Sequence, residues 1–199
     1  MTELEIAAAV AKGEQAAPAP VGKSFLVPMR ISGTGIAYRR AKDELCYRPP
    51  EIWLAPEMQR RALGLPVILE HPKHGSLVTE DDVDETFLGI IVYAYVKSDE
   101  LWGVARIFSE TVAATLAEGS GDDFTTDTSP AVSFAPGARF AALRIDGARV
   151  LVEHTPALID HLAVIITPAD VPGGVWSKGS MDQLGIVPGD IETKEETNG

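Results

Sequence analysis

Three short segments place residues able to do nucleophilic chemistry at the edges of apolar runs: Glu70-His71-Pro72, Thr128-Ser129-Pro130 and Asp160-His161-Leu162. Serine is a weak nucleophile until an imidazole takes its proton, and that imidazole works better when a third group orients it. The sequence therefore supplies the side chains of a serine hydrolase. In this interpretation His71 is the base, Ser129 the nucleophile and His161 the orienting group.

Several neighbours could replace members of this set. Ser133 is a rival nucleophile, because two steps of two residues place it on the same strand face as Ser129. Glu153, His154 and Asp160 are alternative third members. Since Pro130 has no amide N–H, the amide after the serine cannot stabilise an oxyanion as in a nucleophile elbow, and the oxyanion donors remain unassigned.

We expect no metal and no cofactor. His71 and His74 lie three residues apart, which could suit a metal, and a metal hydrolase using His71, His74 and His161 is the weakest hypothesis. Pro72 between the first two makes a shared helical face unfavourable, and no cluster of carboxylates or cysteines completes a ligand set. The Gly33-Thr34-Gly35 turn alone does not make a dinucleotide site.

Composition excludes several classes of partner. The 199-residue chain carries a net charge of −12 and only two adjacent arginine pairs, which argues against nucleic acid. No apolar run reaches the roughly 18 residues that span a bilayer, so we expect no membrane segment, and no signal peptide is visible. The single cysteine, Cys46, is expected to be a small buried hydrophobe in a reducing compartment.

Short β-rich runs dominate from residue 23 onward. Strands are expected at 25–31, 36–39, 66–70, 87–96, 101–108, 125–134, 139–145, 148–153 and 158–167, with helices at 2–12, 56–63 and 109–118. Pro130 indicates that its strand lies at a sheet edge or carries a bulge. This pattern predicts a β-dominated α+β fold, a mostly antiparallel β-barrel with two to four peripheral helices.

Three regions are expected along the chain. Residues 1–22 form a flexible N-terminal segment and linker, in which Pro and Ala alternate over 14–20. Residues 23–178 form the barrel domain. Residues 179–199 are polar and acidic, which is typical of a disordered tail.

The order of motifs within 23–178 resembles the prohead (capsid maturation) proteases of tailed bacteriophages, a phage domain of unknown function that is similar to the herpesvirus assemblin proteases. The matching features are Arg30 in a strand, Gly33 to Tyr38, Tyr47 to Pro50, Pro66 to Pro72, Gly89 to Ile91, Ser129, and Asp160 to Ile165. The resemblance implies a β-barrel that presents His71, Ser129 and His161 in that order. The chain departs from the family pattern in Pro130, where relatives carry Ser-x-Gly and an aromatic, and in having no arginine after Arg149.

The resemblance implies a serine endopeptidase with a Ser-His-His mechanism, which processes scaffold and capsid proteins inside the assembling procapsid, in the host cytoplasm. Residues 16–20 and the acidic tail are candidate self-cleavage regions. The alternative is a catalytically inactive relative that serves as a capsid or scaffold component. The sequence leaves open the cleavage specificity, the choice between Ser129 and Ser133, and the oligomeric state, a homo-oligomer included.

Overall fold

The structure is a computed structural model, and it describes residues 1–39, 44–72, 77–80, 82, 86–119, 124–136, 141–145 and 148–168. His74, the residues 146–147 between two predicted strands, the end of the predicted domain beyond 168 and the predicted tail at 179–199 lie outside these residues.

Within this part, the helices are α1 (Glu3–Lys12), α2 (Pro50–Trp53), α3 (Pro56–Ala62) and α5 (Glu110–Glu118). The strands are β1 (Ala19–Val21), β2 (Ser24–Ser32), β3 (Gly35–Arg39), β4 (Glu44–Arg48), β5 (Pro66–Leu69), β6 (Phe87–Lys97), β7 (Glu100–Ile107), β8 (Phe124–Ser133), β9 (Ala142–Ile145), β10 (Ala148–Val152) and β11 (Leu158–Pro168). No described helix is long and apolar enough to cross a membrane.

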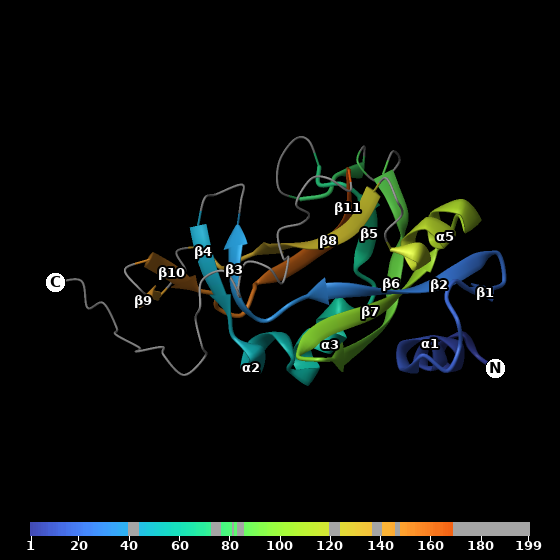
Figure 1. Ribbon diagram of the computed structural model, residues 1–199, viewed down its shortest axis with the longest axis horizontal. Helices are drawn as coiled ribbons and strands as arrows, with labels where there is room; N and C mark the ends of the chain where they lie inside the picture. Colours follow the sequence, from blue (N-terminus) through green and yellow to red (C-terminus); the bar gives the residue numbers. More distant parts are fainter. Residues whose placement is uncertain are drawn as a thin grey trace.

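The strands form two mixed sheets, which Figure 1 shows at opposite ends of the molecule. The larger sheet has the order β1-β2-β7-β6-β5-β11-β8, and the smaller has the order β3-β4-β10-β9. Only β5 with β11 and β4 with β10 are parallel among the described pairs; the others are antiparallel. The β-dominated α+β class and the number of helices predicted from the sequence are therefore confirmed for the described residues.

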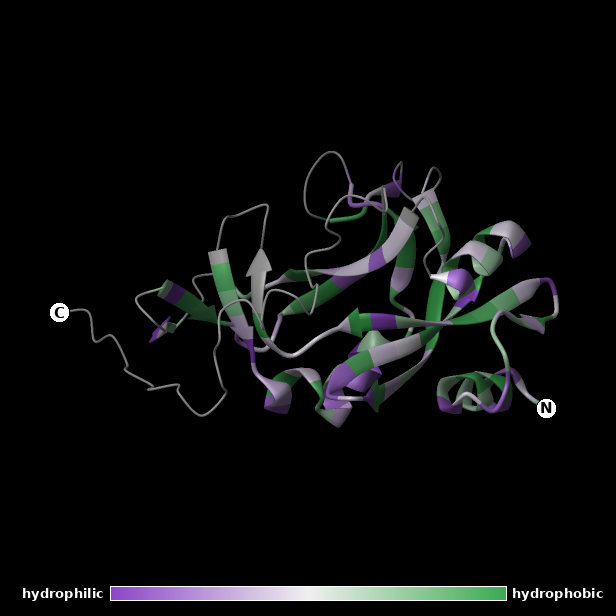
Figure 2. Ribbon diagram, in the orientation of Figure 1, coloured by the Kyte–Doolittle hydropathy of each residue, from purple (hydrophilic) through white to green (hydrophobic). Residues whose placement is uncertain are grey.

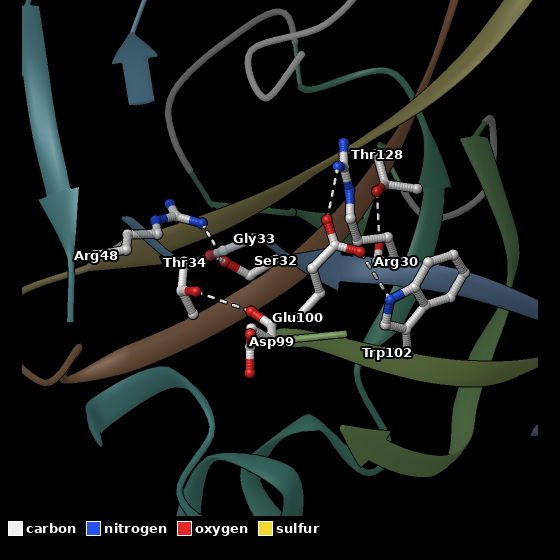
Figure 3. Close-up of polar contacts among 9 residues, drawn as sticks. All are labelled: Arg30, Ser32, Gly33, Thr34, Arg48, Asp99, Glu100, Trp102 and Thr128. Atoms are coloured by element: carbon white, nitrogen blue, oxygen red, sulfur yellow. Dashed lines mark hydrogen bonds and ion pairs between the residues drawn. The ribbon is translucent and has the colours of Figure 1, made fainter. Parts of the chain in front are cut away.

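The predicted closed barrel is wrong, because both described sheets are open. The larger sheet does curl until its last strand, β8, meets β2, and the Thr128 hydroxyl donates a hydrogen bond to the Arg30 carbonyl (Figure 3). No strand ladder joins these two edges in the part of the chain that the structure describes. Pro130 does lie on an edge strand of that sheet, as its lack of an amide donor predicts.

Two prolines explain why the curl stops short of closure. The Arg30 carbonyl faces β8, and the Thr126 amide points away from β11 to donate to the end of α5. Since backbone groups alternate in direction along a strand, Pro28 and Pro130 face the same gap as Arg30 and Thr126. The edges of β2 and β8 that face this gap therefore each lack one amide donor, which disfavours a hydrogen-bonded ladder between the two strands.

The main core lies on one face of the larger sheet and is covered by helices. Val27, Ile31, Val67, Ile107 and Leu162 are fully buried there, together with Trp53 of α2 and Met58 of α3. Figure 2 shows hydrophobic residues along most of these strands. Full burial of each such side chain contributes about 1.5–3 kcal/mol.

The first 22 residues are part of this fold, which corrects the expectation of a flexible arm. Thr2 caps α1 in a capping box with Glu5, and Gly13 ends the helix in the left-handed conformation. One face of α1 packs on the opposite side of the larger sheet, against Leu26 and Val104. Residues 19–21, expected as linker, pair with β2 as the strand β1.

Candidate functional site

Ser129 and His161 lie on the same face of two neighbouring antiparallel strands. In the register of β8 with β11, Ser129 is opposite Ala163 and His161 is opposite Ala131. Residues directly opposite one another share a face, so Ser129 and His161 are diagonal neighbours, a relation in which residues lie roughly 7–8 Å apart. The fold therefore brings together two residues that the sequence analysis singled out.

A β-bulge at Asp160 adds a third group. The register shifts between Ile159 and His161, so that Asp160 is the extra residue of β11. In a regular strand the side chains of Asp160 and His161 would point to opposite faces, whereas a bulge re-aims them. As a result, Asp160 Oδ2 lies 2.8 Å from Nδ1 of the neighbouring His161 ring.

His71 reaches the same place from the end of β5. The Glu70 amide donates to the Val164 carbonyl at 2.9 Å, and Glu70 then adopts a left-handed conformation with φ of 60°. This conformation is uncommon for a non-glycine residue and turns the chain sharply. It places Nδ1 of His71 2.9 Å from Nε2 of His161, with the two rings nearly edge to face at 63°.

The resulting chain His71–His161–Asp160 has a defined direction. An ionised carboxylate only accepts hydrogen bonds, so Nδ1 of His161 is the donor to Asp160. In the neutral His161 ring, Nε2 is then an acceptor. His71 therefore carries its proton on Nδ1, and its other nitrogen, Nε2, keeps a lone pair. His161 is 0% exposed, whereas His71 is exposed at the surface.

The environment also keeps His71 uncharged. Desolvation of its ring lowers the pKa of His71, and repulsion from the His161 ring when that ring is also protonated lowers it further. At neutral pH the ring is therefore in the form that accepts a proton.

Ser129 is buried at 7% exposure, and its hydroxyl has no hydrogen-bond partner among the described residues. The structure therefore does not join it directly to His71. The register of β11 distinguishes Ser129 from Ser133. The end of β5 pairs with Val164, which is opposite Thr128, the neighbour of Ser129. Ser133 lies opposite Leu158, on the other side of the bulge. His71 enters from the end of the sheet where Ser129 lies.

The other two alternatives for the third member of the site, Glu153 and His154, lie elsewhere. Glu153 is 1% exposed and accepts hydrogen bonds from Arg48 Nε at 2.8 Å and Trp53 Nε1 at 3.2 Å, so it serves a structural pair. His154 is exposed on the segment after β10. Among the described residues, no group of three histidine, cysteine or acidic side chains could hold a metal.

Two described cavities lie away from the histidines. One, of about 330 Å³, opens between β2 and β8, where Arg30 Nη1 and Trp102 Nε1 contact the Glu100 carboxylate at 3.3 and 3.1 Å (Figure 3). The other, of about 720 Å³, lies between the end of α1 and the rings of Tyr93 and Tyr95. Neither is lined by Ser129.

Sequence reasoning named Asp160 only as one alternative, because the bulge that aims it has no signal in the sequence. Cys46 is buried, as expected, and takes no part in the site. Comparisons of the chain with protein-family models, with curated proteins and with solved structures found no match.

Proposed function

We propose that this protein is a serine endopeptidase in which Ser129 is the nucleophile, His71 the base and His161 the group that orients the base. The observation that carries the proposal is the hydrogen-bonded pair of imidazoles, 2.9 Å apart, on the sheet face that also holds Ser129. Ser129 is buried on the neighbouring strand, and its hydroxyl has no hydrogen-bond partner within the described part of the chain.

The steps follow from the direction of the hydrogen bonds. His71 Nε2 takes the Ser129 proton as the oxygen attacks the scissile carbonyl, and the imidazolium then gives that proton to the leaving amine. A water molecule, activated by the same nitrogen, hydrolyses the acyl-enzyme. Hydrogen bonds between nucleophile and base are often long or poorly aligned before substrate binds, so the proposal does not require a Ser129–His71 hydrogen bond in the free protein.

Scaffold and capsid proteins of an assembling phage procapsid are the proposed substrates. The support is the order of motifs that resembles the prohead proteases, together with the β-dominated α+β fold of the described residues. The proposed location is the procapsid interior in the host cytoplasm.

A serine-directed fluorophosphonate probe tests the chemistry. We expect the probe to label the wild-type protein and the Ser133→Ala variant equally, and Ser129→Ala not at all. Ser133→Ala is the matched control, because it removes a hydroxyl from the same face of β8. Labelling that persists in Ser129→Ala, or is lost only in Ser133→Ala, would exclude Ser129.

The substrate is tested separately, by expressing the protein with the capsid and scaffold proteins of the same phage. Truncated products are expected with the wild type and their absence with Ser129→Ala.

The lack of an amide on Pro130 and of a partner for the Ser129 hydroxyl favours one alternative, a catalytically inactive relative that acts as a capsid or scaffold component. It predicts no probe labelling of any variant and stable co-purification with shell proteins.

A further inference from the structure

The Asp160 carboxylate accepts two hydrogen bonds on the same oxygen. Oδ2 lies 2.8 Å from Nδ1 of His161 and 2.9 Å from the backbone amide of Val78. Val78 belongs to the connection between β5 and β6, which also carries His71. The Asp160 side chain thus contacts both the buried ring of His161 and the segment that follows His71 in the chain.

The proton order of the two imidazoles depends on this carboxylate. In the reverse order, His161 would present the lone pair of Nδ1 to Asp160 Oδ2, so that two acceptors would face each other at 2.8 Å. His161 is fully buried, so water cannot relieve that repulsion. Without Asp160, either order of the His71–His161 pair would satisfy the hydrogen bond between the rings.

We propose that Asp160 is a positioning residue that fixes the tautomers of both imidazoles, and so places the lone pair of His71 on Nε2. The catalytic meaning of this role rests on the proposed endopeptidase function, but the proton order itself does not. The bulge of β11 is the structural device that makes the contact, because it aims Asp160 at the ring of its own neighbour.

Two substitutions separate the hydrogen bond from the charge. In Asp160→Asn, the Val78 amide requires an acceptor, so the side-chain amide oxygen takes the place of Oδ2 and His161 keeps its proton on Nδ1. Asp160→Ala removes the acceptor altogether. Glu57→Gln is the control, since it neutralises an exposed carboxylate of α3 that pairs with Arg60 and for which no contact with either ring is seen among the described residues.

The ¹⁵N chemical shifts of the imidazole nitrogens measure the tautomers directly. The chain has four histidines, so single His→Gln variants assign every ring. We expect protons on Nδ1 of both His71 and His161 in the wild type, in Asp160→Asn and in Glu57→Gln. In Asp160→Ala we expect a proton on Nε2 of His71 in a substantial fraction of molecules. Wild-type rings with the reverse order would overturn the inference without any variant, and so would unchanged tautomers in a folded Asp160→Ala.

Probe labelling distinguishes this inference from the function on which its meaning rests. Labelling of Asp160→Ala should be slower by about 100-fold or more, since a wrong tautomer in a Ser-His-Asp triad costs ~10⁴-fold, while Glu57→Gln should label at the wild-type rate. If the tautomers behave as expected but no variant is labelled, the endopeptidase function fails and the role of Asp160 in proton order stands. If labelling depends on Ser129 but is normal in Asp160→Ala, the positioning role fails and the function stands.

Discussion

Replacing Glu153 by glutamine should strongly destabilise the fold without changing the candidate site. Arg48 and Glu153 are 2% and 1% exposed, and Arg48 Nε lies 2.8 Å from the Glu153 carboxylate. Arg48 Nη1 also contacts the Ser32 hydroxyl at 2.6 Å (Figure 3), and the guanidinium lies over the Trp53 ring at 4.3 Å. Arg48 thus connects β4 of the smaller sheet with β2 of the larger sheet and with helix α2.

The expected loss comes from the charge that remains. Glutamine keeps the size and an acceptor oxygen, but it removes the negative charge 2.8 Å from Arg48 Nε in a buried site, and breaking a buried ion pair in this way costs about 3–5 kcal/mol. With a urea m-value of roughly 2–3 kcal/mol/M for a chain of this size, the denaturation midpoint should fall by roughly 1–2.5 M.

Urea unfolding followed by tryptophan fluorescence measures this loss. The control is Glu57→Gln, the same substitution in an exposed helical ion pair with Arg60, where solvent screening limits the effect to at most about 1 kcal/mol. An Arg48→Met, Glu153→Leu double variant should recover much of the loss, because it leaves no unpaired charge. A loss for Glu153→Gln no larger than that for Glu57→Gln would refute the reasoning. So would slower labelling of Ser129 in the folded variant, because the structure gives Glu153 no part in the site.

Three further predictions concern the site and its frame. Labelling of Ser129 should rise with pH and level off near neutrality, because only neutral His71 accepts a proton and its lowered pKa places the midpoint below about pH 6.5; a midpoint above that value would contradict the role of desolvation. Glu70→Gly should leave the free energy of unfolding unchanged or higher, whereas Glu70→Val should lower it by about 1–2 kcal/mol, because residue 70 has a φ of 60°. Equal effects of the two substitutions in urea unfolding would exclude backbone strain at this position. Gly89→Ala should lower the melting temperature sharply, at a cost of about 3 kcal/mol, because its Cβ would meet the Arg106 carbonyl at 2.0 Å. Gly33→Ala is the control and should leave the melting temperature nearly unchanged, because a Cβ there would meet nothing within 4 Å.

Local patterns predicted much of the secondary structure because they act within a few residues. Ser109 caps α5 and Gly119 follows its end, as expected from residue type alone. The predicted hairpin around residues 97–100 is the β6–β7 pair, whose turn places Ser98 and Asp99 at positive φ. Pro130 marked an edge strand correctly, since its missing amide is a property of the residue itself.

Such local patterns do not predict whether the larger sheet closes into a barrel. Whether β8 pairs with β2 depends on which backbone groups face each other across a gap, and that follows from the register of every strand between them. The positions of Pro28 and Pro130 on these two edges have meaning only once that register is known.

The sequence by itself determined the chemical types available: one serine beside a proline, histidines at the ends of apolar runs, and a composition with few basic residues. Tertiary structure decided which of them meet. His71 and His161 are 90 positions apart, and Arg48 and Glu153 are 105 apart. A bulge of one residue aims Asp160 at His161, and the left-handed turn at Glu70 brings His71 to the same ring. The physical reason is that side-chain type is local, whereas strand register and the direction of a hydrogen bond depend on contacts between segments distant in the chain.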